Sequence, residues 1–368
     1  MTNALPAMDV AGRSARVRAR LAEARCDALL VTHLTNIRYL TGFTGSAALL
    51  VVAEDELTLV TDGRYEEQAA GELGAAGVTA GVEIGRTGEH QRQLVATRLS
   101  AAPRIGLEAD HVSWSDQRRF AETWFPEAEL VATTGLVEAQ RATKDAGEVA
   151  RIERACSIAD AALAEVCPRL EEHPTEAGFA LTLDSEMRRQ GADDISFETI
   201  VASGPNGSRP HHQPGSRVIE RGDLVVVDFG ALVDGYHSDM TRTIAVGGLD
   251  ALDGAQRRMV EVVTASQAAG VTAVRSGVAT REVDRACRAV IDHAGWGEAF
   301  VHGTGHGVGL DIHEAPAVSG SSTDTLADGQ VVTVEPGVYL PGRGGVRVED
   351  TVVVTPDGSR TLTCAPKS

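Results

Sequence analysis

Cysteines are few in this sequence, and they are widely spaced. No two of them form a C-x-x-C pair, and their number is odd. A count of this kind is unlike the disulfide framework of a secreted protein and favours free thiols in a reducing compartment. The five are Cys26, Cys156, Cys167, Cys287 and Cys364.

Long apolar segments are also missing. No stretch approaches the ~18 uninterrupted apolar residues that a membrane span requires. The first twenty residues, MTNALPAMDVAGRSARVRAR, have neither the apolar core nor the cleavage site of a signal peptide. We therefore expect a cytoplasmic protein without a membrane partner.

Basic residues are outnumbered by acidic ones, 34 against 52, which gives a formal net charge of -18. An acidic surface repels phosphate backbones, so nucleic acid is not an expected partner. The composition is otherwise ordinary for a globular protein, with 43% hydrophobic residues, and 368 residues are enough for two domains.

The first third of the chain alternates between short apolar runs and charged, alanine-rich segments. The runs at 27–32, 47–52 and 57–65 predict strands, whereas 13–25 and about 90–100 predict helices. This alternation is typical of an α/β domain in which helices pack on a mixed sheet. We assign this domain to residues 1–135, with a linker within 132–143.

The rest of the chain, residues 136–368, predicts an α+β domain. Helices are expected from about Lys144 to Val166, from Thr175 to Gln190, and at 253–269 and 280–294. Strand-like segments are expected at 197–204, 223–230, 237–246, 330–340 and 345–354. The two halves of this domain show a loose two-fold repeat, because each half contains helical segments and one pair of strands.

Each strand pair carries two acidic residues, Asp228 with Asp239 and Glu335 with Glu349. A carboxylate that leaves a buried strand is costly unless a cation or hydrogen bonds compensate it. Taken singly, Asp228 is explained as well by a salt bridge or a turn cap, and Glu349 by an ion pair with Arg347. The repetition of the pattern within one chain weakens these alternatives.

A segment rich in glycine and histidine, AFVHGTGHGVGLDIHE, lies between the two strand pairs. Such dense glycine argues for an extended or irregular loop that can approach an ion closely. Four carboxylates and one imidazole form a hard, oxygen-rich set without cysteine, and four negative charges balance two divalent cations. Mn²⁺ suits this set best, and Co²⁺, Fe²⁺ and Zn²⁺ are alternatives. Such a metal pair suits the hydrolysis of an amide.

The motifs VVVDFG, HSDMTRT, HGTGHGVGLDIHE, VTVEPG and GVRVEDT resemble those of the pita-bread metallopeptidases, the family of methionine aminopeptidase, aminopeptidase P and prolidase. The segment DALLVTHLTNIRYLTGFTGSAALLVV resembles the creatinase-type N-terminal domain of the proline-directed members. Together the two resemblances cover nearly the whole chain. They imply a creatinase-type N-terminal domain and a pita-bread catalytic domain.

The resemblance also implies which residues hold two metal ions around one water. Asp228 would bind one metal, Asp239 and Glu349 would bridge both, and His306 and Glu335 would complete the second. Glu335 would in addition carry a proton from the water to the leaving nitrogen.

Four further residues receive roles from the same resemblance. His211 would assist the leaving amide or line the substrate pocket, and His313 would stabilise the tetrahedral intermediate. His302 would contact substrate or its own loop, and Arg347 would orient a metal-binding carboxylate. His212 is expected to be structural or to form a pocket wall.

The N-terminal domain argues against methionine aminopeptidase and implies proline-containing peptides as substrates. Removal of a residue that precedes proline, as by aminopeptidase P, is slightly favoured over hydrolysis of Xaa-Pro dipeptides, as by prolidase. The resemblance also implies a homodimer, in which the partner's N-terminal domain closes the pocket. Two other readings are disfavoured by the intact ligand positions: creatinase, which works without metal, and a non-catalytic peptide-binding relative.

Overall fold

The computed structural model describes residues 5–367. The chain forms two compact units, Ala7–Arg141 and a second that begins at Ala142 and includes residues 5 and 6. The division at 141/142 lies within the linker expected at 132–143, a few residues after the boundary that was assigned from the sequence. Each unit is described by itself.

A six-stranded mixed sheet forms the centre of the N-terminal unit, in the order β4-β3-β2-β1-β5-β6. The β1–β2 and β2–β3 pairs are antiparallel, and the other three pairs are parallel. The mixed sheet expected from the sequence is therefore confirmed. Its strands are β1 (Ala28–Val31), β2 (Ala48–Ala53), β3 (Leu57–Thr61), β4 (Gly81–Ile84), β5 (Arg104–Glu108) and β6 (Glu129–Thr133).

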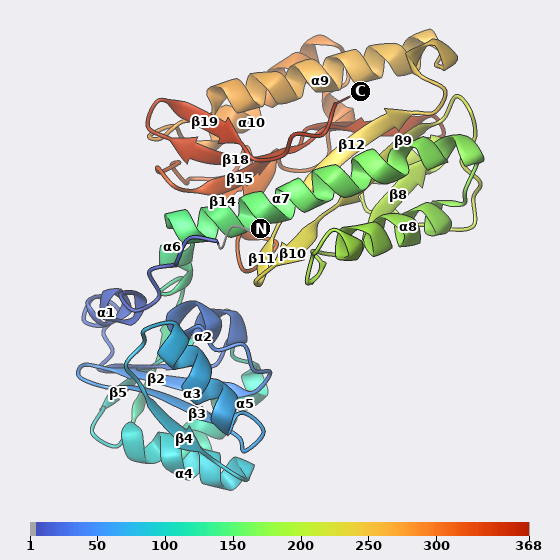
Figure 1. Ribbon diagram of the computed structural model, residues 1–368. Coiled ribbons are helices and arrows are strands. Elements are labelled where there is room, and N and C mark those ends of the chain that lie inside the picture. The colour runs from blue at the N-terminus through green and yellow to red at the C-terminus, as the bar shows by residue number, and fades with distance from the viewer. Residues whose placement is uncertain (1–4, 368) are drawn as a thin grey trace. The chain divides into compact units, whose positions relative to one another are not determined.

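Helices connect most of these strands, and a short turn joins β2 to β3 (Figure 1). The helix expected at 13–25 is shorter, because the chain leaves it through turns after Arg18 and Arg25 takes a left-handed φ of 58°. Helix α2 was not expected from the sequence. The helices are α1 (Arg13–Arg18), α2 (Leu34–Thr41), α3 (Glu66–Ala75), α4 (Gly88–Arg98), α5 (Trp114–Arg119), a π-helical turn (Phe120–Trp124) and α6 (Glu138–Arg141).

Four long helices frame the C-terminal unit, and all four were predicted. Asp145 begins the first of them with a capping box that includes Glu148, and Thr175 caps the second through the backbone N–H of Gly178. The four are α7 (Ala146–Val166), α8 (Glu176–Arg189), α9 (Gly254–Ala273) and α10 (Thr280–His293). Short 3₁₀ turns lie at Cys167–Glu172, Gly204–Ser208, Leu249–Ala251 and Gly297–Ala299.

The strands of this unit form four small sheets, β12-β9-β8, β14-β13-β15-β18-β19, β11-β10-β7 and β16-β17. The first half contributes β7 (Asp194–Ile195), β8 (Ile200–Ser203), β9 (Leu224–Phe229), β10 (Ala231–Val233), β11 (Tyr236–His237) and β12 (Met240–Ala245). The second half contributes β13 (Gly305–Gly307), β14 (Glu314–Val318), β15 (Val331–Val334), β16 (Gly337–Leu340), β17 (Gly344–Arg347), β18 (Asp350–Thr355) and β19 (Gly358–Thr361).

Each acid-bearing hairpin is broken into two parts, which the sequence did not predict. In the first, β9 pairs with β12 while β10 pairs with β11; in the second, β15 pairs with β18 while β16 pairs with β17. Pro336 lacks the N–H that a continuous ladder would need, and Gly230 lies so close to Ser238 that a Cβ atom would be 1.9 Å from its carbonyl oxygen. Asp239, Glu335 and Glu349 lie at these interruptions, next to the ends of β12, β15 and β18, whereas Asp228 lies within β9.

The hydrophobic core of the C-terminal unit has two clusters. Val225, Val227 and Phe229 of β9 pack with α7 and α8, whereas Val332 and Val334 of β15 pack with α9 and α10. Figure 1 shows these helix pairs along opposite sides of the strands. Because side chains alternate along a strand, Asp228 points away from the first cluster and into the middle of the unit.

Candidate active site

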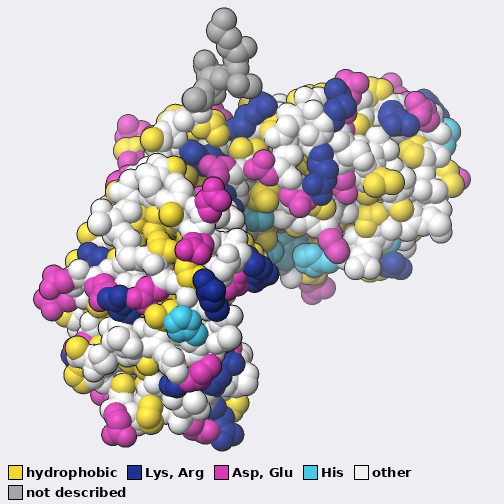
Figure 2. Space-filling model, turned by 60° about the horizontal axis from the view of Figure 1, so that its bottom comes forward, with side chains coloured by type: hydrophobic (Ala, Val, Ile, Leu, Met, Phe, Trp, Pro, Cys, Tyr) yellow, Lys and Arg dark blue, Asp and Glu magenta, His cyan; other side chains and the backbone are white. Residues whose placement is uncertain are grey.

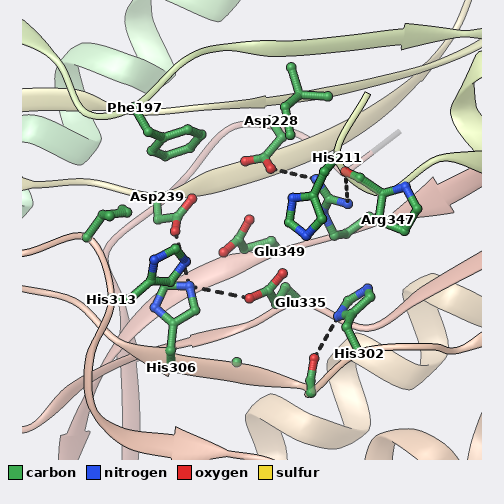
Figure 3. A pocket seen from close by; sticks show the side chains of 15 residues that line it. Phe197, His211, Asp228, Asp239, His302, His306, His313, Glu335, Arg347 and Glu349 are labelled. Atoms are coloured by element: carbon green, nitrogen blue, oxygen red, sulfur yellow. Dashed lines mark hydrogen bonds and ion pairs between the residues drawn. The ribbon is translucent and has the colours of Figure 1, made fainter. Parts of the chain in front are cut away.

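A cavity of about 300 Å³ lies between the two strand groups of the C-terminal unit (Figure 3). All nine residues that were predicted to act in the site line it. Its walls are Phe197, Ile200, Pro210, His211, Asp228, Asp239, His302, Gly303, Gly305, His306, Ile312, His313, Glu335, Arg347 and Glu349.

The four acids reach the cavity from the two broken hairpins. Asp228 is the fifth residue of β9 and lies opposite Thr241, so Asp239, just before β12, is its near neighbour. Glu335 follows β15 directly, and Glu349 immediately precedes β18. The interruption of each hairpin thus places one carboxylate pair at the cavity.

His306 reaches the cavity from the middle of β13, between two glycines. A Cβ atom at Gly305 would lie 2.1 Å from the carbonyl oxygen of Thr333, so this close approach of backbones requires glycine. The Nδ1–H of His306 donates to the carbonyl oxygen of Gly307 at 3.0 Å. Its Nε2 lone pair therefore faces Asp239 and Glu335, each 3.5 Å away, and is free to bind a cation.

Oxygen atoms of Asp228, Asp239 and Glu349 lie within 4.8 Å of one another. Burial and the neighbouring carboxylates raise the pKa of Asp239 and of Glu349 well above their usual values. Burial raises the pKa of Glu335 to about 8. Asp228 Oδ1 and Glu349 Oε1 are buried and accept no hydrogen bond. Such a cluster of oxygen donors is costly without positive charge, and it fits divalent metal ions.

Arg347 is buried beside these acids, and it anchors one of them. Its Nη2 donates to Asp228 Oδ2 at 2.5 Å, its Nε to Thr241 at 3.0 Å and its Nη1 to the Tyr339 hydroxyl at 2.8 Å. The alternative explanation of Glu349, an ion pair with Arg347, is wrong, because Arg347 pairs with Asp228 instead. The expected contact with a candidate metal-binding carboxylate is present.

Three histidines, His211, His302 and His313, complete the polar wall of the cavity. His302 donates from Nδ1 to the carbonyl oxygen of Gly303 at 2.7 Å and accepts from the Tyr339 hydroxyl at Nε2, 2.8 Å away. Burial and the charge of Arg347 lower the pKa of His302 to about 4. His313 packs edge-on against His306, with ring centroids 4.4 Å apart, and burial lowers its pKa. His302 and His313 are therefore neutral at pH 7.

Sequence reasoning missed several residues that shape the site. Tyr339 links His302 to Arg347, and Thr241 donates to Glu349 Oε2 at 2.7 Å. No local pattern marks them, because their partners are distant in the sequence. Phe197 and Ile200 add an apolar wall, which the segment FETIVASG had indicated only as a strand.

The N-terminal unit contains a second group of metal-binding residue types, His33, His111 and Glu138. The two imidazole rings are stacked 3.7 Å apart with an angle of 7° between their planes. Since a metal ion binds in the plane of an imidazole, one ion cannot lie in both planes. We therefore assign no metal to this group.

The surface and the cysteines agree with the composition. Acidic and basic side chains are interspersed on the face shown in Figure 2. All five cysteines are free thiols, as expected. Among residues 5–367, no helix combines the length and apolar character needed to cross a membrane.

Comparison with known proteins supports the assignment of both units. The chain is 40% identical to the uncharacterized peptidase YqhT of Bacillus subtilis over 344 residues, which are 93% of this chain and 94% of that protein. Its structure is similar to the Xaa-Pro dipeptidase from Bacillus anthracis, with a TM-score of 0.92, 36% identity and coverage of 98% and 99% of the two chains. It is also similar to the X-Pro aminopeptidase from Thermotoga maritima, with a TM-score of 0.86, 32% identity and coverage of 95% and 98%.

Two family models match the chain. Residues 13–143 match the creatinase/prolidase N-terminal domain, and residues 150–356 match metallopeptidase family M24. The second match spans the whole cavity, and the family accounts for the oxygen-rich donor set. The chain is a metal-dependent peptidase that belongs to metallopeptidase family M24 and carries a creatinase/prolidase N-terminal domain.

Proposed function

We propose that this protein hydrolyses the peptide bond between an N-terminal residue and a following proline in short peptides. The observation that carries the proposal is the cavity itself, in which four carboxylates and one imidazole converge beside an apolar wall. The two solved structures described above, named as an Xaa-Pro dipeptidase and an X-Pro aminopeptidase, support proline as the residue after the cleaved bond.

The proposal includes two divalent metal ions, held by Asp228, Asp239, His306, Glu335 and Glu349. Four carboxylates would balance the charge of two such ions, and an oxygen-rich set favours Mn²⁺, with Co²⁺, Zn²⁺ or Fe²⁺ as alternatives. When bound, the metals supply polarisation of the scissile carbonyl and a more acidic water.

Glu335 is proposed to transfer the proton. The nitrogen of an Xaa-Pro bond carries no hydrogen, so it must gain one in order to leave as an amine. Glu335 lines the cavity beside the other carboxylates, where its carboxylate would take a proton from water and pass it to that nitrogen.

Three histidines are proposed to act around the substrate, and Arg347 is proposed to orient a metal-binding carboxylate. His211 would assist the leaving amide, and neutral His313 would donate to the carbonyl oxygen as negative charge develops there. His302 would contact substrate or hold its own loop, in which the Gly303 carbonyl oxygen accepts from its Nδ1. Arg347 would hold Asp228 in place through their 2.5 Å hydrogen bond. We also propose that the protein is a homodimer, and a molecular mass from light scattering tests this.

The volume of the cavity favours short peptides. At about 300 Å³ it is at the small end of the range for small-molecule sites, and it suits a few residues rather than a folded chain. A second candidate function is hydrolysis of Xaa-Pro dipeptides alone. The name of the Bacillus anthracis structure, whose TM-score is 0.92, favours this narrower activity.

The experiment compares Leu-Pro, Leu-Pro-Gly and Leu-Pro-Gly-Gly with Leu-Ala and Leu-Ala-Gly, and measures the release of leucine by the Mn²⁺-loaded protein. Release from all three proline peptides and little from the alanine peptides is the expected result. Release from Leu-Pro alone selects the dipeptidase. Equal release from the alanine peptides contradicts the preference for proline.

A further inference from the structure

His211 lies in the segment 204–217, which begins with the 3₁₀ turn Gly204–Ser208 and is anchored on both sides of His211. On its N-terminal side, the carbonyl oxygen of Pro210 accepts from Arg347 Nη1 at 3.3 Å. The same Arg347 holds Asp228. The backbone just before His211 is therefore joined to the carboxylate cluster.

On the C-terminal side of His211, the anchor is a buried carboxylate. The ring Nε2 of His212 lies 2.9 Å from Glu176 Oε2. Glu176 is fully buried in the first turn of α8. Because an ionised carboxylate only accepts, His212 must donate from Nε2. The ring of His212 thus points to Glu176 and does not line the cavity. Its neighbour His211 does line the cavity (Figure 3).

Glu176 organises more of this segment than His212 alone. Its two oxygens also accept from the backbone N–H and hydroxyl of Ser203, from the Asn206 amide and from the backbone N–H of Gly215. All these donors lie within 203–215, on both sides of His211. One carboxylate therefore closes the segment as a loop.

The negative charge of Glu176 is stabilised by its surroundings. Burial alone would raise its pKa, but the hydrogen bonds from Asn206, Ser203 and His212 lower it to about 2. The N-terminus of α8 also favours a negative charge in its first turn. Glu176 is therefore ionised throughout the neutral range and keeps its contact with His212.

We infer that the Glu176–His212 pair is a positioning device for His211, which fixes the angle at which the His211 ring faces the scissile amide. This inference rests on the proposed role of His211 in binding substrate. His212 itself acts only through His211. The sequence analysis had left His212 as structural or as a pocket wall.

The kinetic test uses His212→Phe, which keeps a ring but cannot donate, and His212→Gln, which restores a donor. We expect His212→Phe to lower kcat about 10–100-fold with little change in KM, since a small misplacement of a positioned group costs up to that much. His212→Gln should recover most of the loss. In a His211→Ala background, His212→Phe should cost nothing further. Wild-type activity of His212→Phe, or an equal loss in both backgrounds, overturns the inference.

A second readout does not depend on activity. In protein labelled at histidine, the imidazole Cε1–Hε1 NMR signal of His211 is the one that disappears in His211→Ala. We expect it to shift or broaden in metal-free His212→Phe and to stay unchanged in the control His293→Phe, which alters an exposed residue at the end of α10. An unchanged signal in His212→Phe overturns the inference. A changed signal with no loss of activity in His211→Ala would instead contradict the proposed function of His211.

Discussion

Arg347 donates from Nη2 to Asp228 Oδ2 at 2.5 Å, while the other oxygen of the same carboxylate, Oδ1, is buried and accepts no hydrogen bond. One oxygen of Asp228 is thus held by the protein and the other is left for a cation. Arg347 also binds Thr241 and Tyr339, so a planar, forked group is needed at this position.

Replacement of Arg347 by lysine should therefore weaken metal binding. We expect a loss of about 10–100-fold in affinity, because residues that orient metal ligands typically contribute that much. Isothermal titration of the metal-free protein with Mn²⁺ measures it. Arg343→Lys, at the exposed turn between β16 and β17, is the matched control and should bind as the wild type does. Equal affinities in both variants would refute the role of Arg347.

Replacement of Glu335 by glutamine should keep the fold but remove the proton carrier. We expect turnover of Leu-Pro-Gly to fall by about 10²–10⁴-fold, which is typical for the loss of a general acid–base. The melting temperature of the metal-free protein should not fall, because an amide replaces a carboxyl group whose raised pKa shows that its charge is disfavoured there. Near-normal turnover would remove Glu335 from the proposed proton transfer.

The stability of the metal-free protein should decrease as pH rises. Burial raises the pKa of Glu335 from an ordinary 4.5 to about 8, so the folded state holds a proton that the unfolded chain releases. The stability from this group is complete below pH 4.5 and is lost as the pH rises to about 8. Thermal unfolding at pH 5 to 8 measures the slope. Bound metal should flatten it, and Glu335→Gln should reduce it; a slope unaffected by Glu335→Gln would contradict this account.

Gly305 allows His306 to reach the cavity, so alanine at this position should be damaging. The added Cβ would lie 2.1 Å from the Thr333 carbonyl oxygen, which forces β13 away from β15. We expect destabilisation of about 1–3 kcal/mol or more, by analogy with overpacked cores, together with weaker metal binding. Gly303→Ala is the control, since its Cβ would meet Ser319 at a milder 3.2 Å. Denaturant unfolding of both variants makes the comparison, and similar stabilities would show that the strand can adjust.

Local sequence patterns predicted much of this molecule. The helices from Ala146 and Glu176 follow from capping residues and apolar spacing, and the two acid-bearing strand pairs follow from valine runs. The same runs could not predict that each hairpin breaks beside its acids, because the break depends on backbone contacts such as Gly230 with Ser238. Nor could they predict the contact of His212 with Glu176, which joins residues 36 positions apart.

The most direct test of the central claim is the metal dependence of Xaa-Pro cleavage. The protein is stripped with a chelator, its metal content is determined by mass spectrometry, and Leu-Pro and Leu-Pro-Gly hydrolysis is measured as Mn²⁺ is added back. We predict no cleavage without metal and full recovery at two equivalents per chain. Full cleavage by the metal-free protein would contradict the account.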